Sequence, residues 1–281
     1  MILYQQHIMW YESEMLNETL DSLQIALKYS TLPIDLEFCL NSQTYIETPI
    51  KGKPEDMFEK FKNHPILKNA KIIYKTDNDP FYNIGDWRRE IYSNKHKYTV
   101  WGESDCLVPE DYFYILSNLE INESHVLSLA SRKMGDDSWS VVELEGMELY
   151  NRSWPERNDS IPFPLFARDY IDYEVLNQIN DRGDINIIKN NVPKIDGALL
   201  ALSPNLPQFI PNDLHFARED YCANLIFIKN KIPQYVIKNR IKGHNYNHPL
   251  KRINTLNTRE DNLYKKHEIE SYNMIKNFIN T

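Results

Sequence analysis

Strand-like and helix-like segments alternate along residues 1–115 of this chain of 281 residues. Short runs of β-branched and aromatic residues favour strands, and the stretches between them carry apolar residues at helical spacing. The expected strands span 2–10, 34–42, 70–76 and 97–101, and the expected helices span 13–30, 53–65, 85–94 and 109–119. This order predicts an α/β fold with a mostly parallel central sheet flanked by helices.

Two of the expected helices carry recognisable start signals. The first begins at Ser13, whose hydroxyl suits an N-cap. The last begins at Pro109, because proline is favoured at the first helical position.

The second half of the chain has a less regular pattern. Strands are expected over 125–134, 139–149 and 196–204, while 215–230 mixes helix and strand signals. These segments predict a smaller sheet beside the central one. The last residues predict an amphipathic helix within 257–280. Its apolar positions are Leu263, Tyr272, Ile275 and Phe278.

Composition limits the classes of function. The net charge of -8 disfavours broad binding to a nucleic-acid backbone, which requires a basic surface. Three widely spaced cysteines without a CxxC pair predict reduced thiols and no disulfide framework. No apolar stretch approaches the roughly 18 residues of a membrane span, and the first residues lack the pattern of a signal peptide. We therefore expect a cytoplasmic protein without a membrane span.

Two carboxylates, Glu103 and Asp105, follow the fourth expected strand directly after Gly102. Ligands of α/β sheets bind outside the carboxyl ends of the strands, where these side chains are expected. Carboxylates aimed into one crevice repel one another unless a cation neutralises them, and oxygen ligands suit Mg²⁺ or Mn²⁺. The pattern indicates a metal site, with an ordinary solvated turn as the alternative.

A second polar group lies just upstream, where Asn83 and Gly85 precede Arg88 and Arg89 at the head of an expected helix. A helix start with guanidinium groups nearby favours a diphosphate. The alternative is a surface helix with two solvated arginines.

Together these segments resemble the nucleotide-sugar domain of GT-A glycosyltransferases, closest to the inverting family-2 type. Residues 2–23 resemble the opening strand, loop and helix of that domain, with Tyr11 and Glu12 in the acid-containing loop. Residues 37–43 resemble its second strand, which ends at a nucleoside contact. Here Asn41 stands in place of the usual acid.

The next two segments extend the resemblance. Residues 83–94 resemble the Asn-x-Gly and arginine stretch of the family. Residues 100–113 resemble its metal-binding acid-x-acid signature, followed by proline and a helix, with Glu103 in place of the more usual Asp.

Two segments of the second half also resemble the family. Residues 216–230 resemble the Glu-Asp segment whose carboxylate acts as general base, which implies Asp220 as the base with Glu219 in reserve. Residues 241–249, read as a loop, supply His244 as a candidate late metal ligand.

The resemblance implies a GT-A-like fold and a metal-dependent, inverting glycosyltransferase that uses a nucleotide-diphosphate sugar, with a UDP-sugar favoured. It implies Mn²⁺ or Mg²⁺ held by Glu103, Asp105 and His244. The implied donor contacts are Tyr11, Glu12, Asn41, Asn83, Gly85, Arg88, Arg89 and Ser104.

It also implies one GT-A-like domain over 1–281. Its expected parts are a nucleotide-sugar half (1–115), an acceptor and catalytic half (116–250) and a C-terminal helix (251–281). The acceptor is expected to be a glycan, a protein or a modified nucleic acid. The basic stretch 238–252 keeps the nucleic acid in consideration.

Two other readings stay open. A nucleotidyltransferase can share this layout, but it normally has a glycine-rich, basic loop after the first strand, and residues 5–14 contain no glycine, lysine or arginine. A non-catalytic binding domain on a degenerate transferase fold is the third reading, because Asn41 and Glu103 depart from the family pattern.

Overall fold

The computed structural model describes residues 1–43, 59, 61–90, 95–133, 177, 180, 184–189, 197–211, 219–244 and 262–280. The strands are β1 (Ile2–Met9), β2 (Ile34–Asn41), β3 (Lys71–Lys75), β4 (Tyr98–Gly102), β5 (Cys106–Leu107), β6 (Val126–Lys133), β7 (Ile187–Lys189), β8 (Leu200–Leu202) and β9 (Gln234–His244). The α-helices are α1 (Ser13–Leu27), α3 (Ile84–Glu90), α4 (Tyr112–Asn118), α6 (Glu219–Lys229) and α8 (Asn262–Asn280). Three short 3₁₀ helices are η1 (Trp10–Glu12), η2 (Pro65–Asn69) and η3 (Pro207–Phe209).

The described strands form one sheet in the order β3-β2-β1-β4-β8-β6-β9-β5, and β7 also pairs with β9. All pairs among β1 to β4 are parallel, as predicted from the first half of the chain. β8 lies antiparallel between β4 and β6, and β6 runs parallel to β9. Two of the segments expected to form a smaller sheet, 125–134 and 196–204, contain β6 and β8, and these strands continue the central sheet.

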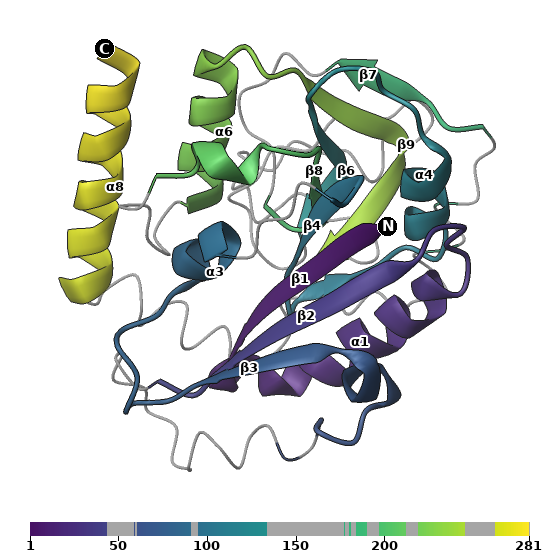
Figure 1. The fold of residues 1–281 in the computed structure, drawn as a ribbon, viewed down its shortest axis with the longest axis horizontal. Coiled ribbons are helices and arrows are strands. Elements are labelled where there is room, and N and C mark those ends of the chain that lie inside the picture. Colours follow the sequence, from purple (N-terminus) through teal and green to yellow (C-terminus); the bar gives the residue numbers. More distant parts are fainter. Residues whose placement is uncertain are drawn as a thin grey trace, which may run out of the picture.

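Helices cover both faces of this sheet (Figure 1). Alternate residues of β1 divide between the faces, as the two-residue period of a strand requires. Tyr4 and Ile8 belong to the core under α1 and α4, whereas Leu3 packs with Trp87 of α3 on the opposite face. A parallel strand buried on both sides explains why β1 is buried along its whole length.

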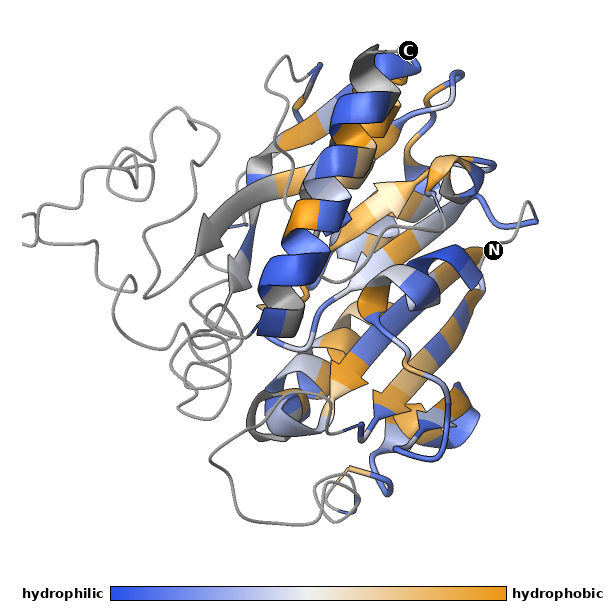
Figure 2. Ribbon diagram, turned by 90° about the vertical axis from the view of Figure 1, so that its left-hand side faces the viewer, coloured by the Kyte–Doolittle hydropathy of each residue, from blue (hydrophilic) through white to orange (hydrophobic). Residues whose placement is uncertain are grey.

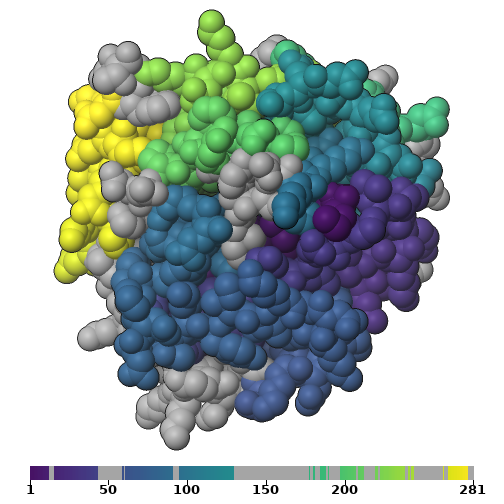
Figure 3. Space-filling model, in the orientation of Figure 1, coloured from purple at the N-terminus to yellow at the C-terminus, as the bar shows by residue number. Residues whose placement is uncertain are grey.

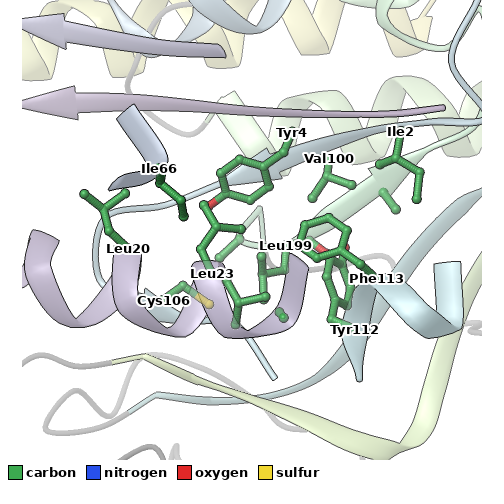
Figure 4. Close-up of a cluster of buried hydrophobic side chains, with 14 of the residues drawn as sticks. Ile2, Tyr4, Leu20, Leu23, Ile66, Val100, Cys106, Tyr112, Phe113 and Leu199 are labelled. Carbon is green, nitrogen blue, oxygen red and sulfur yellow. The ribbon is translucent and has the colours of Figure 1, made fainter. Parts of the chain in front are cut away.

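The larger core lies between the sheet and helices α1 and α4 (Figure 4). Leu20 and Leu23 of α1 and Phe113 of α4 meet Tyr4 of the sheet there, and all four are buried. The smaller core on the other face joins Trp101 of β4 to residues of β8, α6 and α8. Packing of these two cores on opposite faces holds the sheet, and with it the ends of its strands, in place.

The C-terminal helix α8 packs against α6, and the two helices lie side by side on the molecular surface (Figure 3). Hydrophobic and hydrophilic residues alternate along α8 (Figure 2), as expected for an amphipathic helix. Its buried face contains His267, Ser271 and Ile275, which are spaced four residues apart. Tyr272 was expected on this face but is 43% exposed, because it follows the buried Ser271 by one residue and so lies on a different side of the helix.

Several predicted boundaries are wrong for local reasons. α4 begins at Tyr112 and not at Pro109, because the residues before it form a turn in which the Tyr112 N–H donates to the Pro109 carbonyl at 3.0 Å, and Asp111 is the N-cap. The pairing of β5 with the end of β9 places His244 in a strand, where a loop was expected. Ser13 is the first residue of α1 and not its N-cap, which is Glu12.

Other predicted elements fall outside the described residues. They are the strand over 139–149 and most of the helix over 53–65. The last residue of that expected helix, Pro65, is the first residue of η2. None of the helices that the structure describes combines the length and apolar character that a membrane crossing requires.

Candidate active site

The acid-x-acid segment lies in the turn between β4 and β5, at the carboxyl end of the parallel strands. Side chains of α1 hold this turn in place. Thr19 Oγ1 donates to the Ser104 carbonyl at 2.6 Å, and the N–H of Val108 donates to Ser22 Oγ at 3.0 Å. The position of the turn is therefore set by the helix that packs behind it.

The last residue of β4, Gly102, is a glycine because the ring of Tyr4 occupies the space where a side chain would lie. An added Cβ at position 102 would lie 2.2 Å from Tyr4 Oη and 2.4 Å from its Cζ. Tyr4 Oη in turn donates to Gln6 Oε1 at 2.9 Å, which fixes the ring. Glycine allows this close approach of β4 to the ring before the chain turns.

Arg88 reaches the turn from α3 and joins two segments that are distant in the sequence. Its Nη2 lies 3.2 Å from Glu103 Oε1, and its Nη1 lies 3.0 Å from Glu219 Oε1 at the start of α6. The guanidinium carbon lies 4.3 Å from the ring centroid of Trp101. With a side chain only 3% exposed, Arg88 is a buried cation held by two carboxylates and an aromatic ring. We call Arg88, Glu103 and Glu219 the Arg88 cluster.

The start of α3 aims Arg88 at this cluster. Asn83 Oδ1 accepts from the N–H of Gly85 at 2.7 Å and from that of Asp86 at 3.2 Å, while Asp86 Oδ2 accepts from the N–H of Asn83 at 2.9 Å. This reciprocal arrangement is a capping box. Asn83 and Gly85, predicted as donor contacts, are thus seen to build the helix start that orients Arg88.

Arg89 points away from the cluster. Its guanidinium donates to the backbone carbonyl of Pro211 at 3.3 Å and forms an ion pair with Asp86. The two adjacent arginines, predicted as one diphosphate-binding group, therefore have separate roles in the described structure. Arg88 contacts Glu103 and Glu219, whereas Arg89 joins α3 to Pro211, which follows η3.

Asn41 is completely buried at the end of β2. Its Nδ2 donates to the Tyr82 carbonyl at 2.9 Å and lies 3.1 Å from His7 Nε2, and its Oδ1 accepts from the N–H of Gln43 at 2.9 Å. Burial and the nearby charge of Arg88 lower the pKa of His7 to about 3, so its ring is neutral and Nε2 can accept. Asn41 ties the strand ends together, and its direct contact with a nucleoside stays a prediction.

Three other predicted donor contacts lie around the end of β1 and in the turn. Tyr11 and Glu12 form η1, and Glu12 Oε2 accepts from the N–H of Met9 at 3.0 Å. Ser104 is buried, and its hydroxyl has no hydrogen-bond partner among the described residues. η1 leads directly into α1, and α1 binds the turn between β4 and β5. η1 and this turn therefore lie at the same end of the sheet.

Glu219 and Asp220 occupy the first turn of α6. Gly197 faces both this turn and Arg88, since an added Cβ there would lie 2.8 Å from Asp220 Cβ and 3.2 Å from Arg88 Nη1. Sequence reasoning missed Gly197, whose one signal is a lone glycine before a short apolar run. Because Gly197 has no side chain, the Arg88 guanidinium and the first turn of α6 can both lie close to its backbone.

The charges of the Arg88 cluster are unequal in number, since one cation faces several carboxylates. Burial raises the pKa of Glu219 to about 8, Arg88 lowers it, and the charges of Asp220 and Glu103 raise it further. Glu103 is the more exposed acid of the pair on Arg88, at 24% against 13% for Glu219. The proton therefore resides on the deeper carboxyl group, Glu219, near neutral pH.

The backbone segments that carry the predicted metal ligands lie next to each other, because β5 pairs with the end of β9. Cys106, which follows Asp105, is the register partner of His244 in the β5–β9 pair. Among the described residues no three His, Cys, Asp or Glu side chains are arranged to hold a metal ion. The carboxylates of Glu103 and Asp105 are oxygen donors of the kind that Mn²⁺ and Mg²⁺ prefer, and a metal site that includes His244 stays a prediction.

No protein-family model matches this sequence, and no curated protein sequence is significantly similar to it. Solved structures are similar to this chain at low identity. Three of them are S. aureus TarS 1-349 (10% identity, 95% of this chain and 68% of that chain, TM-score 0.48), a mycobacterial protein (13%, 92% and 71%, 0.49) and GalNAc-T7 with UDP, GalNAc and Mn²⁺ (12%, 87% and 44%, 0.48). With TM-scores below 0.5, these similarities do not establish the function of this chain.

The protonated Glu219 predicts a pH dependence of stability. Since folding raises its pKa from 4.5 to about 8, its stabilising contribution is complete below pH 4.5 and is lost as the pH rises to 8. Across this window the free energy of unfolding of the wild type should fall relative to Glu219→Gln by up to about 1.4 kcal/mol per pH unit. Urea denaturation of both proteins from pH 5 to 8 measures this difference, and parallel curves would contradict it.

The two arginines predict different costs of truncation. Arg88→Met leaves two partly buried carboxyl groups without their cation and should lower the free energy of unfolding by about 3 kcal/mol. Arg89→Met removes a partly exposed ion pair and one carbonyl contact and should cost about 1 kcal/mol. Urea denaturation at one pH compares them. Equal losses would show that Arg88 is not the central cation.

Proposed function

We propose that this chain is a glycosyltransferase of the GT-A type, which moves a sugar from a nucleotide-diphosphate sugar to an acceptor hydroxyl with inversion. The observation that supports it is the meeting of Glu103, at the end of β4, with Glu219, at the start of α6, on the buried Arg88. The acid-x-acid and Glu-Asp segments, which carry the resemblance to that family, thereby share one site at the carboxyl edge of the sheet.

The chemistry requires positive charge near the leaving group. The bond between the anomeric carbon and a diphosphate oxygen breaks while the bond to the acceptor oxygen forms, so negative charge develops on the departing nucleoside diphosphate. Preorganised positive groups stabilise that charge. Arg88 provides a fixed cation beside the turn, and its bond to Glu103 orients this carboxylate.

We propose Asp105, Glu103 and His244 as the ligands of Mn²⁺ or Mg²⁺. The support is the donor set and the β5–β9 register, which places His244 opposite the residue after Asp105. When bound, the ion would supply Lewis-acid stabilisation of the diphosphate. The remaining donor contacts, Tyr11, Glu12, Asn41 and Ser104 among them, keep the status of predictions.

We assign Asp220 as the general base. It takes the proton of the acceptor hydroxyl as the new bond to the anomeric carbon forms. Its neighbour Glu219 is bound to Arg88 through Oε1, so this oxygen is less available to an acceptor hydroxyl. Glu219 instead holds the start of α6 against the turn that carries Glu103.

The structure around η1 disfavours a nucleotidyltransferase. After β1 the chain enters η1 and then α1, and the carboxylate of Glu12 accepts the N–H of Met9. A triphosphate loop needs free backbone N–H groups and a lysine or arginine at this place, and this loop has an acid.

The acceptor and the setting follow as further proposals. The donor is a UDP-sugar, and the acceptor is a glycan, a protein or a modified nucleic acid. All three cysteines are buried free thiols, which suits the reducing cytoplasm. Residues 1–115 would bind the donor and 116–250 the acceptor, within one domain that ends in the helical part 251–281.

The assignment of the base predicts a separation of binding from transfer. Asp220→Asn keeps the size of the side chain but removes its basicity, so the transfer rate should fall by about two to four orders of magnitude. The affinity for the donor should stay within about threefold of wild type. A screen of nucleotide sugars, read by diphosphate release, selects the donor, and stopped assays then give the rates.

Glu219→Gln is the matched control and should retain most of the transfer activity. If Glu219→Gln is inactive and Asp220→Asn is active, the segment is right and the base is Glu219. Full activity of both variants would contradict the inverting mechanism. Nucleotide binding without turnover of any sugar in the wild type would favour the non-catalytic binding domain.

A further inference from the structure

Lys242 is a fully buried lysine in β9, although it lies within the basic stretch 238–252 that was considered for nucleic-acid binding. Its Nζ donates a hydrogen bond to the backbone carbonyl of Ala198 and a longer one, 3.4 Å, to Ser128 Oγ. Burial of an ammonium group opposes folding unless polar partners hold it. An apolar residue would fill this space at a lower cost, so the polar contacts of Lys242 point to a role in positioning the backbone that it binds.

That backbone is the short segment 197–199, which leads into β8. Leu199 has a φ of 49°, a left-handed conformation that is unfavourable for any residue with a side chain. Tyr112 Oη of α4 donates to the Leu199 carbonyl at 2.8 Å, and both residues lie in the core shown in Figure 4. Two buried donors, from β9 and from α4, therefore hold adjacent carbonyl groups of a strained segment.

The first residue of this segment touches the site. The backbone at Gly197 lies so near α3 and α6 that a Cβ there would meet Asp220 Cβ at 2.8 Å and the two Arg88 Nη atoms at 3.2 and 3.4 Å. A displacement of Gly197 would therefore change the space available to the guanidinium and to Asp220. The neighbouring carbonyl, that of Ala198, is the one that Lys242 holds.

We infer that Lys242 is a positioning residue, which holds segment 197–199 so that Gly197 closes against Arg88 and Asp220. It acts through the Ala198 carbonyl and not by touching a substrate. The effect on transfer rests on the proposed function, whereas the effect on Arg88 does not.

The test compares Lys242→Met with Lys97→Met. Methionine keeps the length of the side chain without the donor group. Lys97 is a matched control, because its Nζ also donates to a backbone carbonyl, that of Ser117 at 2.9 Å, but lies at the opposite end of β4. The first readout is the ¹⁵N–¹H spectrum of the Arg88 guanidinium, assigned by its loss in Arg88→Met. In the wild type we expect the two ion pairs to slow its rotation and to keep its Nη signals separate.

Lys242→Met should shift and merge the Arg88 Nη signals, while Lys97→Met should leave them unchanged. Gly197→Ala perturbs the same contacts directly, so the double variant Lys242→Met/Gly197→Ala should be no worse than the more severe single one. If Lys242→Met only lowers the melting temperature and leaves the Arg88 signals in place, Lys242 is a structural residue and the inference is overturned.

A kinetic readout follows once a donor sugar is identified. Lys242→Met should lower kcat by about 10- to 100-fold, as small misplacements of catalytic groups do, and leave the donor KM within about threefold. An equal loss in both constants would overturn the inference. Absence of transfer in the wild type would reject the proposed function and still leave the Arg88 spectrum to decide the role of Lys242.

Should Lys242→Met fail to fold, Tyr112→Phe removes the other donor to the same segment. It should produce a smaller change of the Arg88 signals in the same direction. An unchanged Arg88 spectrum in a folded Tyr112→Phe protein would overturn the role assigned to the segment.

Discussion

One buried cation organises the site of this protein. Arg88 carries a single charge and faces two carboxyl groups within hydrogen-bond distance, so the cluster is neutral only if one of them keeps its proton. The deeper one, Glu219, meets this requirement, because burial raises its pKa. The same bonds connect α3, the end of β4 and the start of α6, so Arg88 adds an ionic link between the two halves of the chain to the strand pairing of β4 with β8.

The surrounding polar residues support that cation from behind. Asn83 begins the helix that carries Arg88, and Asn41 with the neutral ring of His7 connects the neighbouring strand ends. Trp101 gives the guanidinium an aromatic face in place of water. These groups are buried, and Asn83, Asn41 and His7 each have a hydrogen-bond partner in the structure. Rigid placement of charge is what stabilisation of a leaving diphosphate requires.

The sequence predicts the first half of the fold well, because buried parallel strands and amphipathic helices have strong local patterns. It does not predict β5, whose two residues are extended only because β9 lies beside them. It identifies Arg88 and Arg89 as a pair, but helix geometry sends adjacent side chains in different directions. The sequence does not show the contacts of Gly197 with Arg88 and Asp220 or of Lys242 with Ala198, because the residues in each pair are distant in the chain.

The central claim is that the carboxyl edge of this sheet binds a nucleoside diphosphate together with a divalent ion. Isothermal titration of UDP, with GDP as a comparison, into the wild type and Asp105→Asn tests it most directly, with and without Mn²⁺. We expect UDP to bind the wild type more tightly when Mn²⁺ is present, and Asp105→Asn to lose this gain while staying folded. Absence of binding by either nucleotide under both conditions would contradict the account.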